Sequence, residues 1–186
     1  MALARPSLDQ MRPQLRELLS SVYPDWPKKG VVFRDIMPLF QRPDLIRDLS
    51  LAIAEHCRSL ATRVEVVAGL EARGFLFGPM VAVELNVPFV PIRKKGKLPG
   101  EVIAYSYMKE YGPDTMEIQK SAIKPGAKVF IVDDLLATGG TMKCGVELVR
   151  QAGGQVAETF CLIELADLKG KQALPEGISF FSVLQF

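Results

Sequence analysis

The hydrophobic pattern from residue 64 onward alternates between short apolar runs and longer amphipathic stretches. Apolar runs without interspersed polar residues are typical of strands buried on both faces of a sheet. The amphipathic stretches have helical spacing, at residues 75–85 and from 141 to about 151. Strands are predicted at residues 64–68, 88–92, 116–118, 128–132, 156–165 and 178–184. Repeated strand–helix–strand units predict an α/β fold with a mostly parallel sheet flanked by helices.

Two further helices are predicted before this alternation begins. Leucines at helical spacing predict a first helix over residues 12–22, with Pro13 in its first turn. A second helix is predicted over residues 43–60, where apolar residues again recur on one face. Between them, prolines and a glycine indicate an irregular connection at 23–30, followed by a short extended piece at 31–33.

The strongest functional pattern lies at residues 129–141, Val-Phe-Ile-Val-Asp-Asp-Leu-Leu-Ala-Thr-Gly-Gly-Thr. Asp133 and Asp134 are expected at the C-terminal end of a buried strand, where parallel sheets bind ligands. The small-residue turn at 137–141 opens a helix, whose free N–H groups and dipole can bind phosphate. Two adjacent, poorly hydrated carboxylates need donors, and a diol supplies them. The pattern predicts a sugar-phosphate site; the alternative is that the acids cap a helix and the glycines only form a turn.

Four other polar features allow both a functional and a structural interpretation. Arg73 follows a buried strand and needs an anion, which is either pyrophosphate or the side chain of Glu71. The basic, glycine-containing loop at 93–97 is, by itself, typical of a solvated surface. Glu110 is either a proton-transfer carboxylate or an exposed loop acid. His56, the only histidine, is expected to be structural or exposed rather than catalytic.

The composition limits the class of protein. The 186 residues are 48% hydrophobic and 24% charged, as expected of one domain with a substantial core. A net charge of +2 gives no reason to expect nucleic acid or a membrane as a partner. Three cysteines without metal-ligand spacing indicate buried thiols in a reducing compartment, so a cytoplasmic location is expected. The N-terminus lacks the apolar core of a signal peptide, and no apolar run is long enough to span a bilayer.

Residues 129–141 resemble the phosphoribosyl-pyrophosphate motif of the type I phosphoribosyltransferases. Four further segments resemble members of this family that act on adenine: Val-Val-Phe-Arg-Asp-Ile (31–36), Gly-Leu-Glu-Ala-Arg-Gly-Phe (69–75), Arg-Lys-Lys-Gly-Lys-Leu-Pro-Gly (93–100) and Glu-Tyr-Gly (110–112). The resemblance implies a single phosphoribosyltransferase domain over residues 1–186. Within it, residues 1–40 would form an N-terminal helix and a small base-binding hood, and residues 93–112 a mobile active-site loop.

The same resemblance implies a purine-salvage enzyme that transfers ribose 5-phosphate from phosphoribosyl pyrophosphate to N9 of adenine, giving AMP and pyrophosphate. Mg²⁺ would be held mainly by the substrate pyrophosphate and ribose, with no protein metal ligands. A homodimer without nucleic-acid or membrane partners is implied. Two alternatives stay open: a phosphoribosyltransferase for another base, such as xanthine or orotate, and a non-catalytic regulator that senses phosphoribosyl pyrophosphate.

By position, the resemblance also implies a role for each group of site residues. Glu110 would be the catalytic residue, near the base nitrogen and the leaving group. Ribose and its 5-phosphate would be bound by Asp133, Asp134, Ala137, Thr138, Gly139, Gly140 and Thr141. Pyrophosphate would be bound by Arg73, Arg93, Lys94 and Lys97. Adenine would be bound by Val32, Phe33, Arg34 and Leu165.

Within the adenine group, Phe33 would stack on the purine, while backbone atoms of Val32 and Arg34 read its edge. Leu165 would close the other face. The sequence departs from the family pattern at Met37 and at residues 108–109, where Met-Lys precedes Glu110. These departures bear on loop motion rather than on the chemistry.

Overall fold

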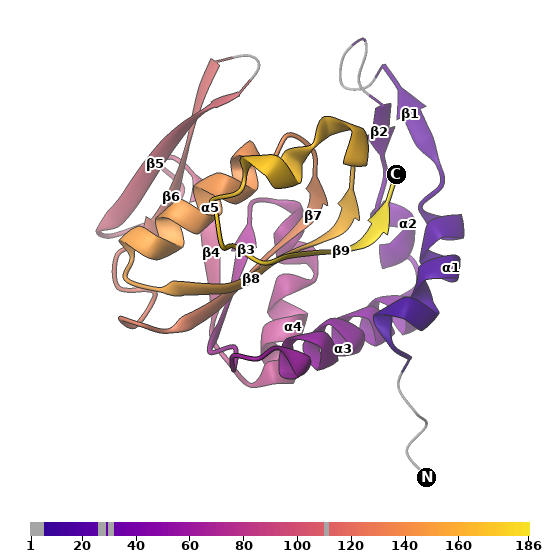
Figure 1. The fold of residues 1–186 in the computed structure, drawn as a ribbon, viewed down its shortest axis with the longest axis horizontal. Helices are drawn as coiled ribbons and strands as arrows, with labels where there is room; N and C mark the ends of the chain where they lie inside the picture. Colours follow the sequence, from indigo (N-terminus) through magenta and orange to yellow (C-terminus); the bar gives the residue numbers. More distant parts are fainter. Residues whose placement is uncertain (1–5, 26–28, 30–31, 110–111) are drawn as a thin grey trace.

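The computed structural model describes residues 6–25, 29, 32–109 and 112–186. A seven-stranded sheet in the order β5-β6-β4-β3-β7-β8-β9 forms its centre (Figure 1). The strands are β3 (Val66–Leu70), β4 (Phe89–Lys94), β5 (Val102–Lys109), β6 (Gly112–Gln119), β7 (Lys128–Leu136), β8 (Gln155–Glu164) and β9 (Phe180–Gln185). From β4 to β9 the neighbours are parallel, whereas β6 is antiparallel to β4 and β5. The prediction of an α/β fold with a mostly parallel sheet is confirmed.

Helices cover both faces of this sheet (Figure 1). The helices α1 (Leu8–Leu18), α2 (Met37–Phe40), α3 (Pro43–Ser59) and α4 (Gly78–Leu85) share one hydrophobic core, and α5 (Gly140–Gln151) belongs to a second. Successive strand residues alternate between the two cores: Val67 and Val132 lie in the first, Ala68 and Ile131 in the second. Because both faces are covered, the central strands are apolar at nearly every position.

The first helix begins four residues earlier than predicted. Ser7 caps it: its hydroxyl accepts a hydrogen bond from Gln10 N at 3.3 Å, and the Gln10 side chain accepts one from Ser7 N at 2.8 Å. Pro13 therefore lies inside α1 rather than in its first turn. Val22 lies beyond the helix, exposed on β1 (Val22–Pro24). The second predicted helix agrees with α3 to within one residue.

Two boundaries at the C-terminal ends of the strands also differ from the prediction. β7 continues through Asp133 and Asp134 to Leu136, because β8 pairs with it as far as Glu164. The acid pair thus lies within the strand rather than directly after it. The helix expected over residues 75–85 is interrupted: a 3₁₀ turn, η1 (Arg73–Leu76), precedes α4.

The segment 93–112, expected to be a loop, is mostly strand where the structure describes it. It contains the end of β4, a turn, and β5, which pairs with β6 from Val102–Gln119 to Lys109–Gly112. This hairpin projects at the upper left of Figure 1. A second antiparallel ribbon, β1 with β2 (Val32–Arg34), projects at the upper right. Both stand at the end where the parallel strands finish, which is where such sheets bind ligands.

Helix lengths and hydropathy also bear on membrane insertion. Within the described part of the chain, no helix combines the length and apolar character needed to cross a bilayer.

Candidate active site

A cleft of about 320 Å³ opens at the C-terminal ends of β3 and β7. Its wall comes from the residues after β3, the end of β7, the turn at 137–141 and the hairpin β5–β6. The lining residues are Glu71, Ala72, Arg73, Lys94, Tyr107, Asp114, Met116, Asp133, Asp134, Leu135, Leu136, Ala137, Thr138, Gly139, Gly140 and Thr141. All residues predicted to bind ribose and its 5-phosphate therefore line one cleft, together with Arg73 and Lys94.

The turn at 137–141 presents the N-terminus of α5 to the cleft. Gly139, immediately before α5, has a φ of 83°, which glycine adopts without strain. A Cβ added at Gly139 would lie 2.2 Å from the carbonyl oxygen of Gly170, and one added at Gly170 would lie 2.1 Å from that of Ala137. The 3₁₀ turn η3 (Gly170–Ala173) thus packs directly on the loop. Because the first N–H groups of a helix have no partner within it, an anion in the cleft can accept from them.

The two acids of β7 are buried, with 8% of Asp133 and 3% of Asp134 exposed. Asp133 Oδ1 accepts a hydrogen bond from Asp134 N at 2.9 Å. Burial, and then the neighbouring carboxylate, raises the pKa of Asp133 well above its ordinary value. Burial also raises the pKa of Asp134, although Arg73 opposes this. Buried acids with raised pKa values in a cleft are typical of sites that bind a ligand carrying hydrogen-bond donors.

Arg73 is turned toward the acid pair. Its Nε lies 3.1 Å from Asp134 Oδ2. The structural alternative, an ion pair between Arg73 and Glu71, is therefore wrong. Among the described residues, Arg73 Nη1 is buried without a hydrogen bond, and Asp134 Oδ2 has only this ion pair. A buried donor left unsatisfied beside a buried acid pair indicates a place that a polar ligand completes.

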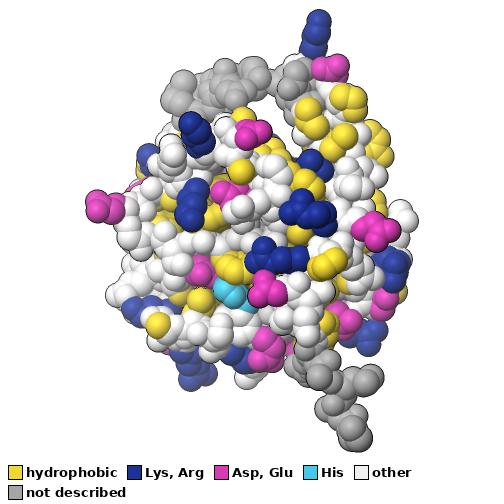
Figure 2. Space-filling view, turned by 45° about the vertical axis from the view of Figure 1, so that its right-hand side comes forward, with side chains coloured by type: hydrophobic (Ala, Val, Ile, Leu, Met, Phe, Trp, Pro, Cys, Tyr) yellow, Lys and Arg dark blue, Asp and Glu magenta, His cyan; other side chains and the backbone are white. Residues whose placement is uncertain are grey.

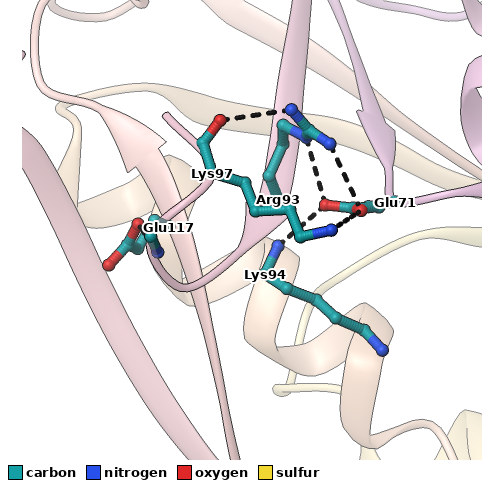
Figure 3. A network of polar contacts seen from close by, with 6 residues as sticks. Glu71, Arg93, Lys94, Lys97 and Glu117 are labelled. Carbon is teal, nitrogen blue, oxygen red and sulfur yellow. Dashed lines mark hydrogen bonds and ion pairs between the residues drawn. The ribbon is translucent and has the colours of Figure 1, made fainter. Parts of the chain in front are cut away.

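Glu71 instead binds the predicted basic group (Figure 3). Its carboxylate accepts from Arg93 Nε at 3.1 Å, Arg93 Nη2 at 3.3 Å and Lys94 N at 3.0 Å, and Lys97 Nζ lies 3.6 Å away. Arg93 Nη1 donates to the carbonyl oxygen of Lys97 at 3.1 Å. Burial raises the pKa of Glu71, but the hydrogen bonds from Arg93 and Lys94 outweigh it, so the pKa lies below its ordinary value. Arg93 and Lys97 are thus held by Glu71.

Lys94 differs from its basic neighbours in direction. Its side chain points away from Glu71 (Figure 3) and lines the cleft. The difference follows from strand geometry, because successive side chains of β4 point to opposite faces. Of the four residues predicted to bind pyrophosphate, Arg73 and Lys94 line the cleft, and Arg93 and Lys97 do not.

The residues predicted to bind the base lie beside the cleft rather than in its lining. The guanidinium carbon of Arg73 lies 5.1 Å from the ring centre of Phe33. Leu165 follows β8, and its N–H donates to the carbonyl oxygen of Leu136, a lining residue, at 2.9 Å. Val32 is 56% exposed. Glu110, predicted to be catalytic, lies outside the described residues.

Tyr107 is a cleft residue for which the sequence analysis predicted no role. Its hydroxyl lies 3.1 Å from Thr141 Oγ1, so the hairpin β5–β6 and the turn at 137–141 are in direct contact. Asp114 and Met116, on β6, line the cleft beside it. Tyr105 and Tyr107 are two residues apart, and this strand spacing was the available signal. The neighbouring glycines and lysines favour a loop instead, and this composition masks the strand spacing.

His56 lies at a different place in the fold. Its Nε2 is 2.5 Å from Glu158 Oε1 on β8, and its ring centre is 4.3 Å from that of Phe181. Neither His56 nor Glu158 lines the cleft. The contacts are those of a structural histidine.

Comparison with known proteins identifies relatives with the same architecture. The family profile described as "Phosphoribosyl transferase domain" matches residues 39–184. The chain is 58% identical over 171 residues to a protein of Caenorhabditis elegans named adenine phosphoribosyltransferase, and the match covers 92% of each chain.

Two solved structures of adenine phosphoribosyltransferases are also similar. One, from Saccharomyces cerevisiae, is complexed with adenine and an imino-altritol bisphosphate; the TM-score is 0.86 at 42% identity, over 93% of this chain and 98% of that one. The other, from Trypanosoma brucei, is in complex with AMP, pyrophosphate and ribose-5-phosphate; the TM-score is 0.85 at 30% identity, over 94% of this chain and 78% of that one. The chain therefore belongs to the phosphoribosyltransferase family and, within it, to the adenine phosphoribosyltransferases.

Proposed function

We propose that this cleft transfers ribose 5-phosphate from phosphoribosyl pyrophosphate to N9 of adenine, giving AMP and pyrophosphate in purine salvage. One observation carries the proposal: a helix N-terminus, a buried acid pair and Arg73 lie together in a cleft of about 320 Å³. Each fits a different part of the donor, respectively its 5-phosphate, its ribose hydroxyls and its pyrophosphate. The names of the relatives point to adenine as the acceptor base.

The donor would be held by its two ends. The 5-phosphate accepts hydrogen bonds from the N–H groups at 138–141, and the hydroxyls of Thr138 and Thr141 add donors. The ribose hydroxyls donate to Asp133 and Asp134, which stabilises the charged form of these buried acids. The pyrophosphate meets Arg73 and Lys94, which line the same cleft. Arg93 and Lys97 would reach it after leaving Glu71.

In the transfer, the bond from the ribose C1 to the pyrophosphate oxygen breaks as the bond from C1 to N9 of adenine forms. Positive charge develops on the ribose, and the nearby carboxylates of Asp133 and Asp134 stabilise it. The electron pair of the broken bond leaves with pyrophosphate, whose charge Arg73 balances. Glu110 is proposed to act in the proton transfer at the base. The hairpin β5–β6 would exclude water, which otherwise hydrolyses the donor.

Adenine would lie between Phe33 and Leu165. Its 6-amino group donates and its N1 accepts, whereas hypoxanthine presents the opposite pattern at these positions. The backbone N–H and C=O groups of Val32 and Arg34 are fixed and can match only one of the two patterns. Unpaired polar groups in the wrong complex can reject a base by roughly 10⁴-fold.

Mg²⁺ is proposed as the cofactor, held mainly by the donor. The described residues include no group of three or more acidic, His or Cys side chains that could hold a metal ion. Asp134 Oδ2 is already ion-paired with Arg73 Nε at 3.1 Å, so the site fits an ion that takes its ligands from pyrophosphate and ribose. When bound, the ion neutralises the leaving group.

We further propose that residues 1–186 form one domain, with a base-binding hood at 1–40, and that the protein is a cytoplasmic homodimer. Cys57, Cys144 and Cys161 are all buried, and buried thiols are expected in a reducing compartment. Sedimentation velocity would test the dimer.

An assay of AMP formation from radiolabelled adenine, phosphoribosyl pyrophosphate and Mg²⁺ tests the proposed function. Hypoxanthine, guanine and xanthine serve as competitors. We expect AMP formation with little competition. Equal use of hypoxanthine would contradict the assigned base. Tight binding of phosphoribosyl pyrophosphate without transfer to any base would favour the sensing regulator instead.

A further inference from the structure

The β1–β2 ribbon needs support from the body of the protein. It forms a two-stranded sheet separate from the seven-stranded one. Because an isolated two-stranded ribbon is marginally stable, its position depends on side-chain contacts. Two such contacts come from successive residues of β2: Phe33 meets Arg73 at 5.1 Å, and Arg34 meets the ring of Phe186. Figure 1 shows the C-terminal end of the chain beside β2.

The Phe186 ring binds two guanidinium groups. The guanidinium carbon of Arg34 lies 3.5 Å from the ring centre, and that of Arg16 on α1 lies 4.7 Å away. Arg16 also donates to the carbonyl oxygen of Gln185 at 3.0 Å. Burial, and then the charge of Arg16, lowers the pKa of Arg34, so the ring holds two cations that repel each other. In Figure 2, basic side chains gather below the largely apolar surface of the ribbon.

The backbone of Phe186 has a different role. Its N–H donates to the carbonyl oxygen of Glu164 at 3.0 Å, and its carbonyl oxygen accepts from Ala166 N at 2.9 Å. These two bonds fix the residues on either side of Leu165. Phe186 therefore contacts one wall of the proposed adenine site through its ring and the other through its main chain.

We propose that Phe186 is a positioning residue for adenine: its ring seats β2 at the correct distance from Leu165. This inference rests on the proposed function. Phe186 does not line the donor cleft. Losing the ring would release Arg34, and the β2 backbone, which contacts the base, would then shift. The turn at 137–141, the acid pair and Arg73 would stay in place.

Steady-state kinetics on four variants of the full chain test this role. Phe186→Leu removes the ring, Phe186→Tyr retains it, Arg34→Gln removes the cation, and the double variant Phe186→Leu/Arg34→Gln measures their coupling. Arg16→Gln is the matched control, because it removes the other guanidinium from the same ring and leaves the contact of Arg34 with that ring in place.

We expect Phe186→Leu and Arg34→Gln each to raise the adenine KM by about threefold to thirtyfold, the range of a cation–ring contact. The double variant should raise the adenine KM no more than the more damaging of the two single variants does. Phe186→Tyr and Arg16→Gln should have an adenine KM close to that of wild type. The KM for phosphoribosyl pyrophosphate should stay within about twofold, which a general loss of stability would not explain.

The proposal is overturned if Phe186→Leu leaves the adenine KM unchanged, raises both KM values equally, or adds independently to Arg34→Gln. Failure of the proposed function has a different signature, because wild type would then form no AMP from adenine.

Discussion

At the scale of single residues, Asp133 places a carboxylate on a central strand with only 8% of the residue exposed. Its burial and the adjacent Asp134 disfavour the charged form, and its pKa is raised. The folded protein then binds more protons than the unfolded chain between the unfolded pKa, about 3.9, and the raised folded value. Stability therefore falls as pH rises through this window. Asp133 therefore lowers the stability of the ligand-free protein. Its charged form is stabilised when a ligand donates hydrogen bonds to it.

Asp133→Asn should consequently stabilise the ligand-free protein, with an advantage that is absent near pH 4 and grows as pH rises. The same change should weaken binding of phosphoribosyl pyrophosphate by about tenfold to a hundredfold, the effect of losing a charge-assisted hydrogen bond. Thermal unfolding from pH 4 to 8 and calorimetric titration would measure the two effects.

Asp44 provides the control for this experiment. It is exposed, and its hydrogen bond from Arg42 lowers its pKa, so Asp44→Asn should give no stabilisation that grows with pH. A wild-type protein that gains stability relative to Asp133→Asn as pH rises would contradict our account of the acid pair.

Glu71 illustrates a second effect at this scale, because its carboxylate binds Arg93 and Lys97, the two basic residues that do not line the cleft. Glu71→Gln should weaken the hold on these two cations, which must leave Glu71 to reach pyrophosphate, and we expect the KM for phosphoribosyl pyrophosphate to fall by about tenfold, or ~1.4 kcal/mol. The adenine KM should not change. Glu101→Gln, which breaks the exposed pair with Lys120, is the control. An equal effect of both variants would show that Glu71 has no special role.

At the scale of elements, the conformation of the turn at 137–141 depends on a segment far away in sequence. The 3₁₀ turn η3 presses Gly170 against the carbonyl oxygen of Ala137, which leaves no room for a side chain at either glycine of the contact. Gly139 therefore admits η3 and, in the function that we propose, also allows the main chain to approach the anion. A substitution there would disturb both.

Gly170→Ala separates these functions, because Gly170 does not line the cleft. The added Cβ would sit 2.1 Å from the Ala137 oxygen and displace the turn, so we expect a loss of about 1–3 kcal/mol in stability and a higher donor KM. Gly177→Ala is strained by a φ of 79° but its Cβ meets nothing within 4 Å, so it should cost stability while leaving the donor KM unchanged. Unaltered donor kinetics in Gly170→Ala would show that η3 does not shape the phosphate site.

The elements also show what the sequence could predict. Strands buried on both faces are recognisable, because β3 and residues 129–132 of β7 are apolar without interruption. β5 carries a strand signal, because Tyr105 and Tyr107 alternate with exposed Ala104 and Ser106, but it follows a basic, glycine-containing segment whose composition favours a loop. The partner of Glu71 could not be predicted, since it depends on the register that sets Leu70 beside Ile92 and so brings Arg93 to Glu71. The local sequence pattern predicts the motifs that line the cleft. The long-range pairing of strands determines which basic side chains face the cleft.

At the scale of the whole molecule, the two substrates are assigned to different parts of the chain. The residues proposed to bind phosphoribosyl pyrophosphate lie at the ends of the adjacent central strands β3 and β7, within the sheet. The proposed base-binding groups come from the N-terminal ribbon and from the residue after β8. The transfer requires that these parts meet at the ribose C1, so the position of AMP across them is the central claim.

A crystal structure of the protein with AMP tests this claim most directly. We predict the phosphate within hydrogen-bond distance of the main-chain N–H groups at 138–141 and the ribose hydroxyls on Asp133 and Asp134. The adenine should lie between Phe33 and Leu165. A phosphate bound instead at the basic turn of residues 93–97, with the adenine away from β2, would contradict the account.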